Sequence, residues 1–242
     1  MIKQLIINTI GKIFTKKIIE NPTSVSPEIV EKRVNKTHGL TQKTYDLIIK
    51  HETGGESYYK KALQRPTYPG GQSGVTIGIG YDLGYNTAEG FARDWKNKLD
   101  AKVFARLHGC LGLKGKAASG KISGLKDIYI PWSSALEVFN ERTLPRFINL
   151  TKASFPGADK LDPDAFGALV SIVFNRGGST KGASRLEMKN IKDAISSKPA
   201  NKDLYTYIAD QIVSMKRLWV GKGLNGLLAR RDEEAKIVRS VK

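Results

Sequence analysis

The stretch GVTIGIGYDLG, residues 74–84, divides a helical segment before it from a longer helical body after it. Val75, Thr76 and Ile77 favour β-strand, and the closely spaced glycines interrupt any helix. We therefore predict a small β-hairpin region between residues 58 and 84. Thr76 and Asp82 are an even number of residues apart, so an unbroken strand would place both side chains on one face.

Before the hairpin region, Thr41 is suited to be the N-cap of a helix that ends at the Gly54-Gly55 pair. Glu52 falls in the last turn of this helix, where the helix dipole and partial burial both favour a protonated carboxyl group. Glycoside hydrolysis needs such a group to protonate the leaving oxygen. Taken alone, however, a glutamate at this position is more often a solvated surface residue.

After Gly84 the apolar spacing predicts a mostly helical body. A helix capped by Thr87 would bury Phe91, Trp95, Leu99 and Val103, and the glycine- and lysine-rich residues 109–124 are expected to form a loop. Further helices are expected over residues 133–150, 163–175, 184–196, 203–220 and 226–238. The fold class that follows is α+β, mostly helical. The length of 242 residues suits one large domain, which we place at residues 39–242, with a short appendage.

Residues 1–38 are predicted to form an N-terminal amphipathic helix and a linker. In residues 1–20 the apolar side chains follow one helical face and lysines lie elsewhere. The segment is too short and too often interrupted by lysine for a membrane span, and it lacks the features of a signal peptide. It fits a helix docked on the protein itself or on a protein partner. A helix lying on a membrane surface is the alternative.

The chain is strongly basic, with 40 Lys and Arg against 23 Asp and Glu and a net charge of +17. Such a chain associates with polyanions, and its basic surface fits the anionic polymers of a bacterial envelope. No sequence motif of a specific nucleic-acid-binding fold is present. Cys110 is the only cysteine, which excludes an intramolecular disulfide and a cysteine-rich metal site.

The sequence gives little support for three other chemistries. The GKGLNG sequence at residues 221–226 has dinucleotide-loop spacing but follows a helical pattern instead of a strand. His51-Glu52 begins a zinc-protease motif, but Gly55 stands where the second histidine is required. No serine-nucleophile elbow occurs. We therefore expect neither a metal nor an organic cofactor.

The combination of Glu52, a helix-to-hairpin turn and TIGIGY at residues 76–81 resembles the phage-type lysozymes, glycosidases that cleave between N-acetylmuramic acid and N-acetylglucosamine. Two later stretches are similar to the same family. ALVSIVFNRGG at residues 168–178 resembles its central helix and cleft-closing loop, and GLLARRDEE at residues 226–234 resembles its GLxxRRxxE segment. The three motifs span residues 40–240 in the family's order. The resemblance implies a lysozyme-like fold, with a small β-hairpin lobe and a larger helical lobe flanking a cleft.

The resemblance also implies an inverting reaction with Glu52, Thr76 and Asp82 as the catalytic residues. Many phage-type lysozymes place the second acid about six residues before the threonine, where this chain has Gly70; the order found here resembles the pesticin-type members. Glu52 would protonate the glycosidic oxygen, while Asp82 and the Thr76 hydroxyl activate water on the opposite sugar face. Inverting enzymes hold their two carboxyl groups roughly 6.5–9.5 Å apart. A turn-forming role for Asp82 is the alternative.

Four further residues follow from the resemblance. Arg230 aligns with an arginine that pairs with the catalytic glutamate; alternatively it is a helix-surface charge spaced i,i+4 from Glu234, worth a few tenths of a kcal/mol. Asn175 would donate a hydrogen bond to substrate from across the cleft, or would only cap its helix. Gly78 and Tyr81 would bind substrate or support the hairpin.

The expected function is hydrolysis of peptidoglycan glycan strands and bacterial cell lysis. Alternatives are a lytic transglycosylase, a catalytically silent wall-binding or virion-structural domain, and a basic nucleic-acid-binding protein. Without a secretory signal, the protein would be made in the host cytoplasm or carried in a phage particle, and would act on the wall in the periplasm. Residues 1–38 are short for a receptor-binding and translocation apparatus, which favours a phage lysin over an injected toxin.

Overall fold

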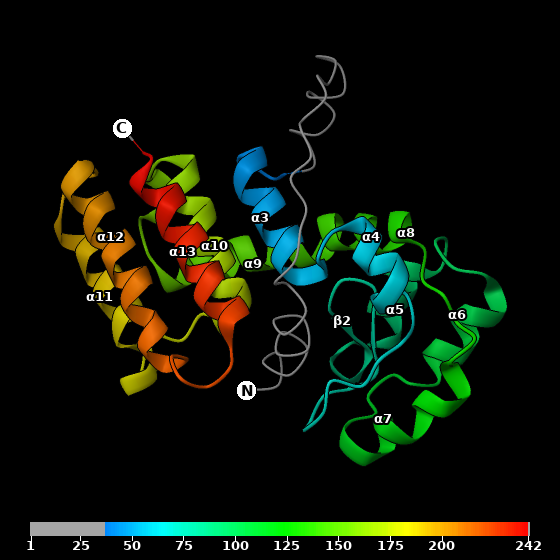
Figure 1. The fold of residues 1–242 in the computed structure, drawn as a ribbon. Helices are drawn as coiled ribbons and strands as arrows, with labels where there is room; N and C mark the ends of the chain where they lie inside the picture. The colour runs from blue at the N-terminus through cyan, green and yellow to red at the C-terminus, as the bar shows by residue number, and fades with distance from the viewer. Residues whose placement is uncertain (1–36, 242) are drawn as a thin grey trace. The chain divides into compact units, whose positions relative to one another are not determined.

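The computed structural model describes residues 37–241. The amphipathic helix and most of the linker expected over residues 1–38 lie outside the described residues. The described chain is mostly helical and contains one two-stranded antiparallel sheet (Figure 1). This confirms the predicted α+β, mostly helical class. Within residues 37–241, no helix combines the length and the apolar character that crossing a membrane requires.

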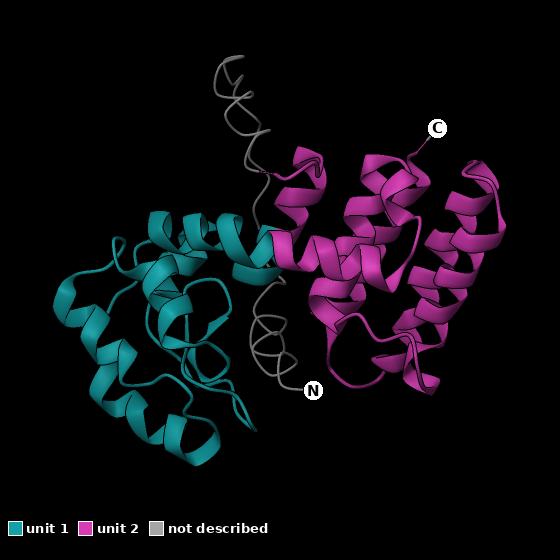
Figure 2. Ribbon diagram, turned by 180° about the vertical axis from the view of Figure 1, so that it is seen from behind, with its two compact units in different colours: residues 1–6, 49–144 teal, residues 7–48, 145–242 magenta. Residues whose placement is uncertain are grey.

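The described residues divide into two compact units (Figure 2). Unit 1 comprises residues 49–144, and unit 2 comprises residues 37–48 together with residues 145–241. Helix α3 (Gln42–Thr53) begins in unit 2 and ends in unit 1, and helix α9 (Leu144–Ser154) begins with the last residue of unit 1.

Unit 1 carries the sheet and a set of short helices. Its elements after α3 are α4 (Glu56–Tyr58), the π-helical turn η1 (Tyr59–Leu63), β1 (Thr76–Ile77), β2 (Tyr81–Asp82), the 3₁₀ turn η2 (Leu83–Tyr85), α5 (Ala88–Trp95), α6 (Ala101–His108), α7 (Gly115–Lys121), the 3₁₀ turn η3 (Ile122–Leu125), α8 (Trp132–Val138) and the π-helical turn η4 (Phe139–Thr143). Fully buried aromatic side chains from η1 and α5 form the centre of its core: Tyr59, Phe91 and Trp95.

Unit 2 is built around a buried helix. Its elements after α9 are the 3₁₀ turn η5 (Ala158–Lys160), α10 (Pro163–Arg176), the 3₁₀ turn η6 (Ala183–Arg185), α11 (Leu186–Ser197), α12 (Lys202–Ser214), the 3₁₀ turn η7 (Met215–Leu218) and α13 (Asn225–Arg239). Every residue from Ala165 to Asn175 in α10 is buried. A helix that is apolar on all sides needs neighbours all round, and α10 packs on α13, which packs on α12.

The predicted helix ends around Glu52 are confirmed. The Thr41 hydroxyl accepts a hydrogen bond from the Thr44 backbone N–H at 3.3 Å, as expected of an N-cap. At the other end, Gly54 has φ of 68° and its N–H donates to the Lys50 carbonyl at 2.8 Å. A left-handed residue ends a helix at little cost only when it is glycine, so the Gly54-Gly55 pair fixes where α3 stops.

Two predictions about the segment after Gly84 were wrong. The helix capped by Thr87 ends at Trp95, and the chain starts a new helix at Ala101, because the Asp100 carboxylate caps the Lys102 N–H at 2.8 Å. The expected loop over residues 109–124 contains α7, which the buried Ala118 and the following Leu125 anchor to the core. By contrast, α10 and α13 agree with their predicted bounds to within a residue.

Candidate functional site

The hairpin places Thr76 and Asp82 directly opposite one another on β1 and β2. The backbone N–H and carbonyl of Thr76 bond instead to Thr67, at 2.8 and 2.9 Å. Thr76 and Asp82 are therefore a non-hydrogen-bonded antiparallel pair, the kind in which the two side chains come closest. The unbroken strand considered in the sequence analysis is not found, because a turn separates β1 from β2; pairing across this turn places Thr76 and Asp82 on one face.

The Asp82 carboxylate is held by backbone N–H groups. Oδ1 accepts from Gly84 at 2.8 Å and from Gly74 at 3.0 Å, while Oδ2 has only a longer contact with the Gly74 N–H, at 3.2 Å. Burial raises the pKa of Asp82 above its ordinary value, and these hydrogen bonds together with the Lys114 charge lower it in part. The result is a fixed, half-buried carboxylate of raised basicity, with Oδ2 as its less engaged oxygen.

Two glycines allow this arrangement. A Cβ on Gly74 would overlap both the backbone of Gly84 and the Asp82 carboxylate, and a Cβ on Gly84 would overlap Gly74 and the Leu113 carbonyl. The two backbone segments therefore approach each other closely at Gly74 and Gly84, which only glycine permits. Gly78 has a different role, since its φ of 54° belongs to the turn between the strands.

Glu52 lies in the last turn of α3 and is half-buried. The residue after it, Thr53, is buried, and its hydroxyl donates to the Ile49 carbonyl at 2.7 Å and accepts from the Gly55 N–H at 3.0 Å. The helix end that carries Glu52 is therefore fixed by local hydrogen bonds. Glu52, Thr76 and Asp82 all belong to unit 1.

Tyr81 supports the hairpin from the core side. Its side chain is 6% exposed, its ring meets the Trp95 ring edge-on at 5.6 Å, and its hydroxyl donates to Asp94 Oδ2 at 3.0 Å. Asp94 is buried and also binds Arg93 and Arg142, at 2.9 and 2.7 Å. Sequence reasoning missed Asp94, because nothing in its local pattern distinguishes it from a solvated helix residue.

Lys114 is a second residue that the sequence analysis did not single out. Its ammonium lies over the Tyr85 ring, 3.7 Å from the ring centroid, and the Tyr85 hydroxyl donates to the Gln72 carbonyl at 3.0 Å. A cation held on an aromatic face is positioned more tightly than a free lysine. Lys114 is also the cationic residue that lowers the pKa of Asp82.

Asn175, in unit 2, does not cap its helix. Its side chain is 7% exposed, and neither its amide nitrogen nor its amide oxygen has a hydrogen-bond partner among the described residues. At the end of α10 it is the Gly177 N–H that donates a hydrogen bond to a helix carbonyl, that of Val173, at 2.7 Å. Buried amides are rarely left unbonded, so Asn175 is a candidate ligand contact.

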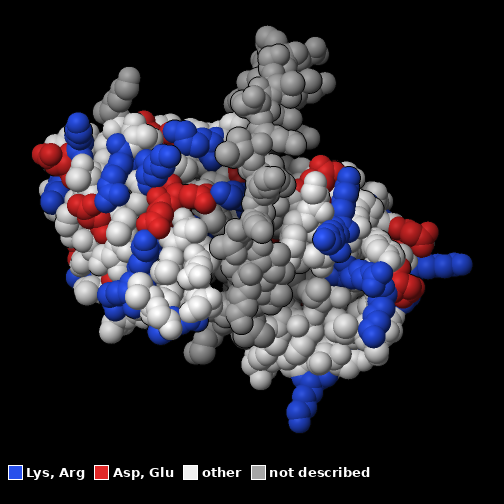
Figure 3. Space-filling model, in the orientation of Figure 1, with Lys and Arg blue, Asp and Glu red and all other residues white. Residues whose placement is uncertain are grey.

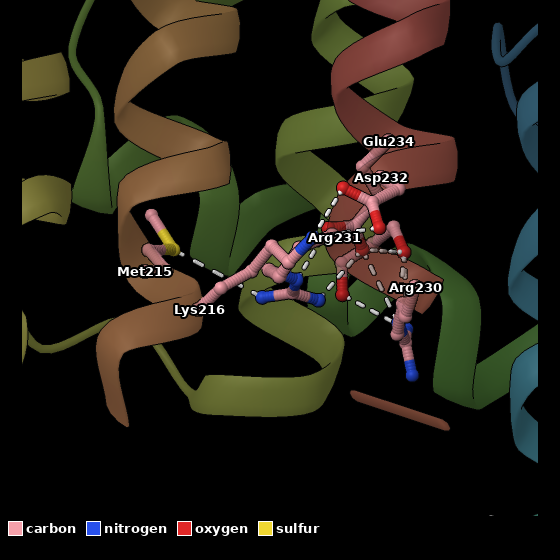
Figure 4. Close-up of polar contacts among 7 residues, drawn as sticks. Met215, Lys216, Arg230, Arg231, Asp232 and Glu234 are labelled. Carbon is pink, nitrogen blue, oxygen red and sulfur yellow. Dashed lines mark hydrogen bonds and ion pairs between the residues drawn. The ribbon is translucent and has the colours of Figure 1, made fainter. Parts of the chain in front are cut away.

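Arg230 belongs to a buried charge network on α13 (Figure 4). Its guanidinium donates to Glu234 at 3.2 Å and to the Ser171 carbonyl and hydroxyl at 3.0 Å. Arg231 donates to the same Glu234 oxygen at 2.8 Å, and burial lowers the pKa of Arg231 to about 10. The expected i,i+4 partner of Arg230 is confirmed, but the pair is buried and not on the helix surface.

Residues 37–241 contain no cluster of three or more His, Cys, Asp or Glu side chains placed to hold a metal ion. The groups gathered around the hairpin are a hydroxyl, a fixed carboxylate and a lysine, which can position and deprotonate a water molecule.

A family model described as "Domain of unknown function (DUF8812)" matches residues 41–143. The match includes Glu52, Thr76 and Asp82 and ends before Asn175 and Arg230. A comparison with curated proteins found no match.

Proposed function

We propose that the protein is a lysozyme-like peptidoglycan glycosidase that hydrolyses the β-1,4 bond between N-acetylmuramic acid and N-acetylglucosamine with inversion. The observation that carries this proposal is the Thr76–Asp82 pair, in which a hydroxyl and a backbone-fixed carboxylate share one face of the hairpin. The three sequence motifs resembling the phage-type lysozymes support the same reading.

In this proposal Asp82 is the general base. Its carboxylate is oriented by the Gly74 and Gly84 N–H groups, so it can hold a water molecule without reorganising. The raised pKa makes Asp82 a stronger base than an ordinary aspartate. The Thr76 hydroxyl helps to hold the same water.

Glu52 is the proposed proton donor to the leaving oxygen. It is half-buried at the fixed end of α3, whereas Glu56, the one other acid between it and Asp82 in sequence, is exposed and paired with Lys60 at 2.6 Å. The exposed Glu56 serves as a matched control for the role of Glu52, since it lies four residues away in the same unit.

The test is clearing of permeabilised Gram-negative cells by the full chain and by Glu52→Gln, Asp82→Asn and Glu56→Gln. Removing a general acid or base costs about 10²–10⁴-fold, so the first two variants should lose nearly all activity and the third should keep it. Wild-type clearing by Glu52→Gln or Asp82→Asn would refute that residue's assignment. An inactive wild-type protein that still binds the wall would favour a silent wall-binding domain.

We further propose that the protein acts in the bacterial periplasm, where its substrate lies, as a phage lysin. Fractionation of infected cells and purified virions with an antibody to the protein tests this setting. Detection in neither fraction during infection would contradict it.

A further inference from the structure

Unit 2 contains an open groove of about 730 Å³ beside α11. Its walls come from the loop before η6, from η6, from α11 and from η7, and they include Lys181, Ala183, Lys189, Lys192, Asp193 and Arg217. The volume falls within the range of sites that bind small ligands. Four of the lining side chains are basic and one is acidic, so the groove carries a surplus of positive charge. Figure 3 shows that on one face of the molecule Lys and Arg are interspersed with Asp and Glu.

Two of the four basic residues are already paired. Lys189 binds Asp193 at 2.6 Å, and Arg217 binds the buried Glu187, with a second contact at 3.2 Å. Lys181 and Lys192 have no acidic partner in the described part of the chain. Their ammonium groups are therefore available to an anion.

A further cation contacts the chain segment that lines the groove. Arg176 donates to the carbonyl of Ser184, which adjoins the lining residue Ala183. Its Nε is buried and has no hydrogen-bond partner among residues 37–241. Burial, together with the charges of Arg185 and Arg231, lowers the pKa of Arg176 to about 9. Positive charge is thus concentrated here beyond what the neighbouring acids balance, and a bound anion would relieve that repulsion.

We propose that this groove binds a small phosphorylated ligand carrying at least two negative charges. Lysine ammonium groups bind phosphate as point charges, and two of them are unpaired here. The lining contains no aromatic ring on which a base could stack, which disfavours single-stranded nucleic acid. The inference does not depend on the proposed glycosidase activity, whose residues Glu52, Thr76 and Asp82 belong to unit 1.

The experiment is calorimetric titration of the full chain with glucose 1,6-bisphosphate at physiological salt. Neutral N-acetylglucosamine, citrate and a single-stranded DNA oligonucleotide are separate arms. The test variant is Lys181→Gln with Lys192→Gln. The matched control is Lys202→Gln with Lys236→Gln, which removes the same charge from exposed positions on α12 and α13.

We expect the bisphosphate to bind and the test variant to lose about tenfold or more in affinity, as for lost bonds to charged groups. The control should stay within about twofold, and thermal melting should show both variants folded. An equal loss of affinity in both variants, or binding of citrate as tight as that of the bisphosphate, would show non-specific electrostatic attraction and would contradict a specific site in the groove. Tighter binding of the oligonucleotide, lost in the same variant, would overturn the assignment of a small phosphorylated ligand, as would no binding of the bisphosphate at all.

Discussion

Thr76 and Asp82 face each other across a two-stranded sheet as a non-hydrogen-bonded pair. Neighbouring backbone groups hold the pair in place. Thr67 forms hydrogen bonds with the backbone N–H and carbonyl of Thr76, and the N–H groups of Gly74 and Gly84 donate to the Asp82 carboxylate. A short, twisted strand pair is marginal alone, so the surrounding contacts fix the geometry of the two side chains.

Two substitutions of Thr76 distinguish the contribution of its hydroxyl group to activity from the contribution of its packing. Thr76→Val keeps the branched shape that suits a strand and removes the hydroxyl, whereas Thr76→Ser keeps the hydroxyl. We expect the valine variant to lose about a hundredfold in kcat/KM, a loss typical of a misplaced reactant, and the serine variant to keep most activity. Soluble peptidoglycan fragments provide the assay. Equal activity of the valine variant and the wild type would remove Thr76 from the reaction.

Replacing Lys114 should move the acid limb of the pH profile. Burial raises the pKa of Asp82 and the Lys114 charge lowers it in part, so Lys114→Gln should raise that pKa further. A general base must be ionised, so the acid limb of kcat/KM should move to higher pH, with little change above the limb. The control is Lys116→Gln, an exposed lysine two residues along. Identical limbs in all three proteins would show that Lys114 does not act on Asp82.

The contact between Gly74 and Gly84 should tolerate no side chain. A methyl group on Gly74 would overlap Gly84 and Asp82, and overpacking of this kind costs about 1–3 kcal/mol in unfolding free energy. Gly74→Ala should therefore lose both stability and activity. Gly120 is the control, because a Cβ there meets nothing and alanine in a helix is favoured by about 0.5–1 kcal/mol. Denaturant unfolding of both variants checks the contrast, and equal stability would contradict it.

The α13 network should be far more sensitive than the neighbouring surface pair. Glu234→Gln removes the buried carboxylate charge with which Arg230 and Arg231 both pair, and breaking a buried pair costs about 3–5 kcal/mol. Asp232→Asn on the same helix removes only the exposed contact with Lys216, worth at most about 1 kcal/mol. Denaturant midpoints measure both changes. A Glu234→Gln protein as stable as Asp232→Asn would mean that the network does not hold unit 2 together.

Local sequence signals were sufficient to predict the helix and the hairpin that carry the proposed catalytic residues Glu52 and Asp82. The Thr41 cap, the Gly54-Gly55 stop and the strand-forming residues 75–77 each act through the neighbouring backbone. The ends of α3 and the position of the hairpin were therefore predictable from residues close in sequence.

Features that depend on distant contacts were not predictable. The helical spacing of apolar residues continues from Trp95 to Val103, so the sequence pattern does not reveal that the helix is interrupted before Asp100. The interruption becomes evident only from the hydrogen bond by which Asp100 caps the next helix. The glycines in residues 109–124 conceal α7, which forms because buried Ala118 packs against the core. The buried role of Asp94 depends on Arg142, 48 positions later in the sequence.

Mass spectrometry of muropeptides from a digest by the full chain tests the glycosidase assignment most directly. We expect products with a reducing N-acetylmuramic acid end, each carrying one added water, and none from Glu52→Gln or Asp82→Asn. Anhydro products without added water would indicate a lytic transglycosylase. The same hydrolytic products from either variant at the wild-type rate would contradict the assignment of a proton donor at Glu52 and a water-activating base at Asp82.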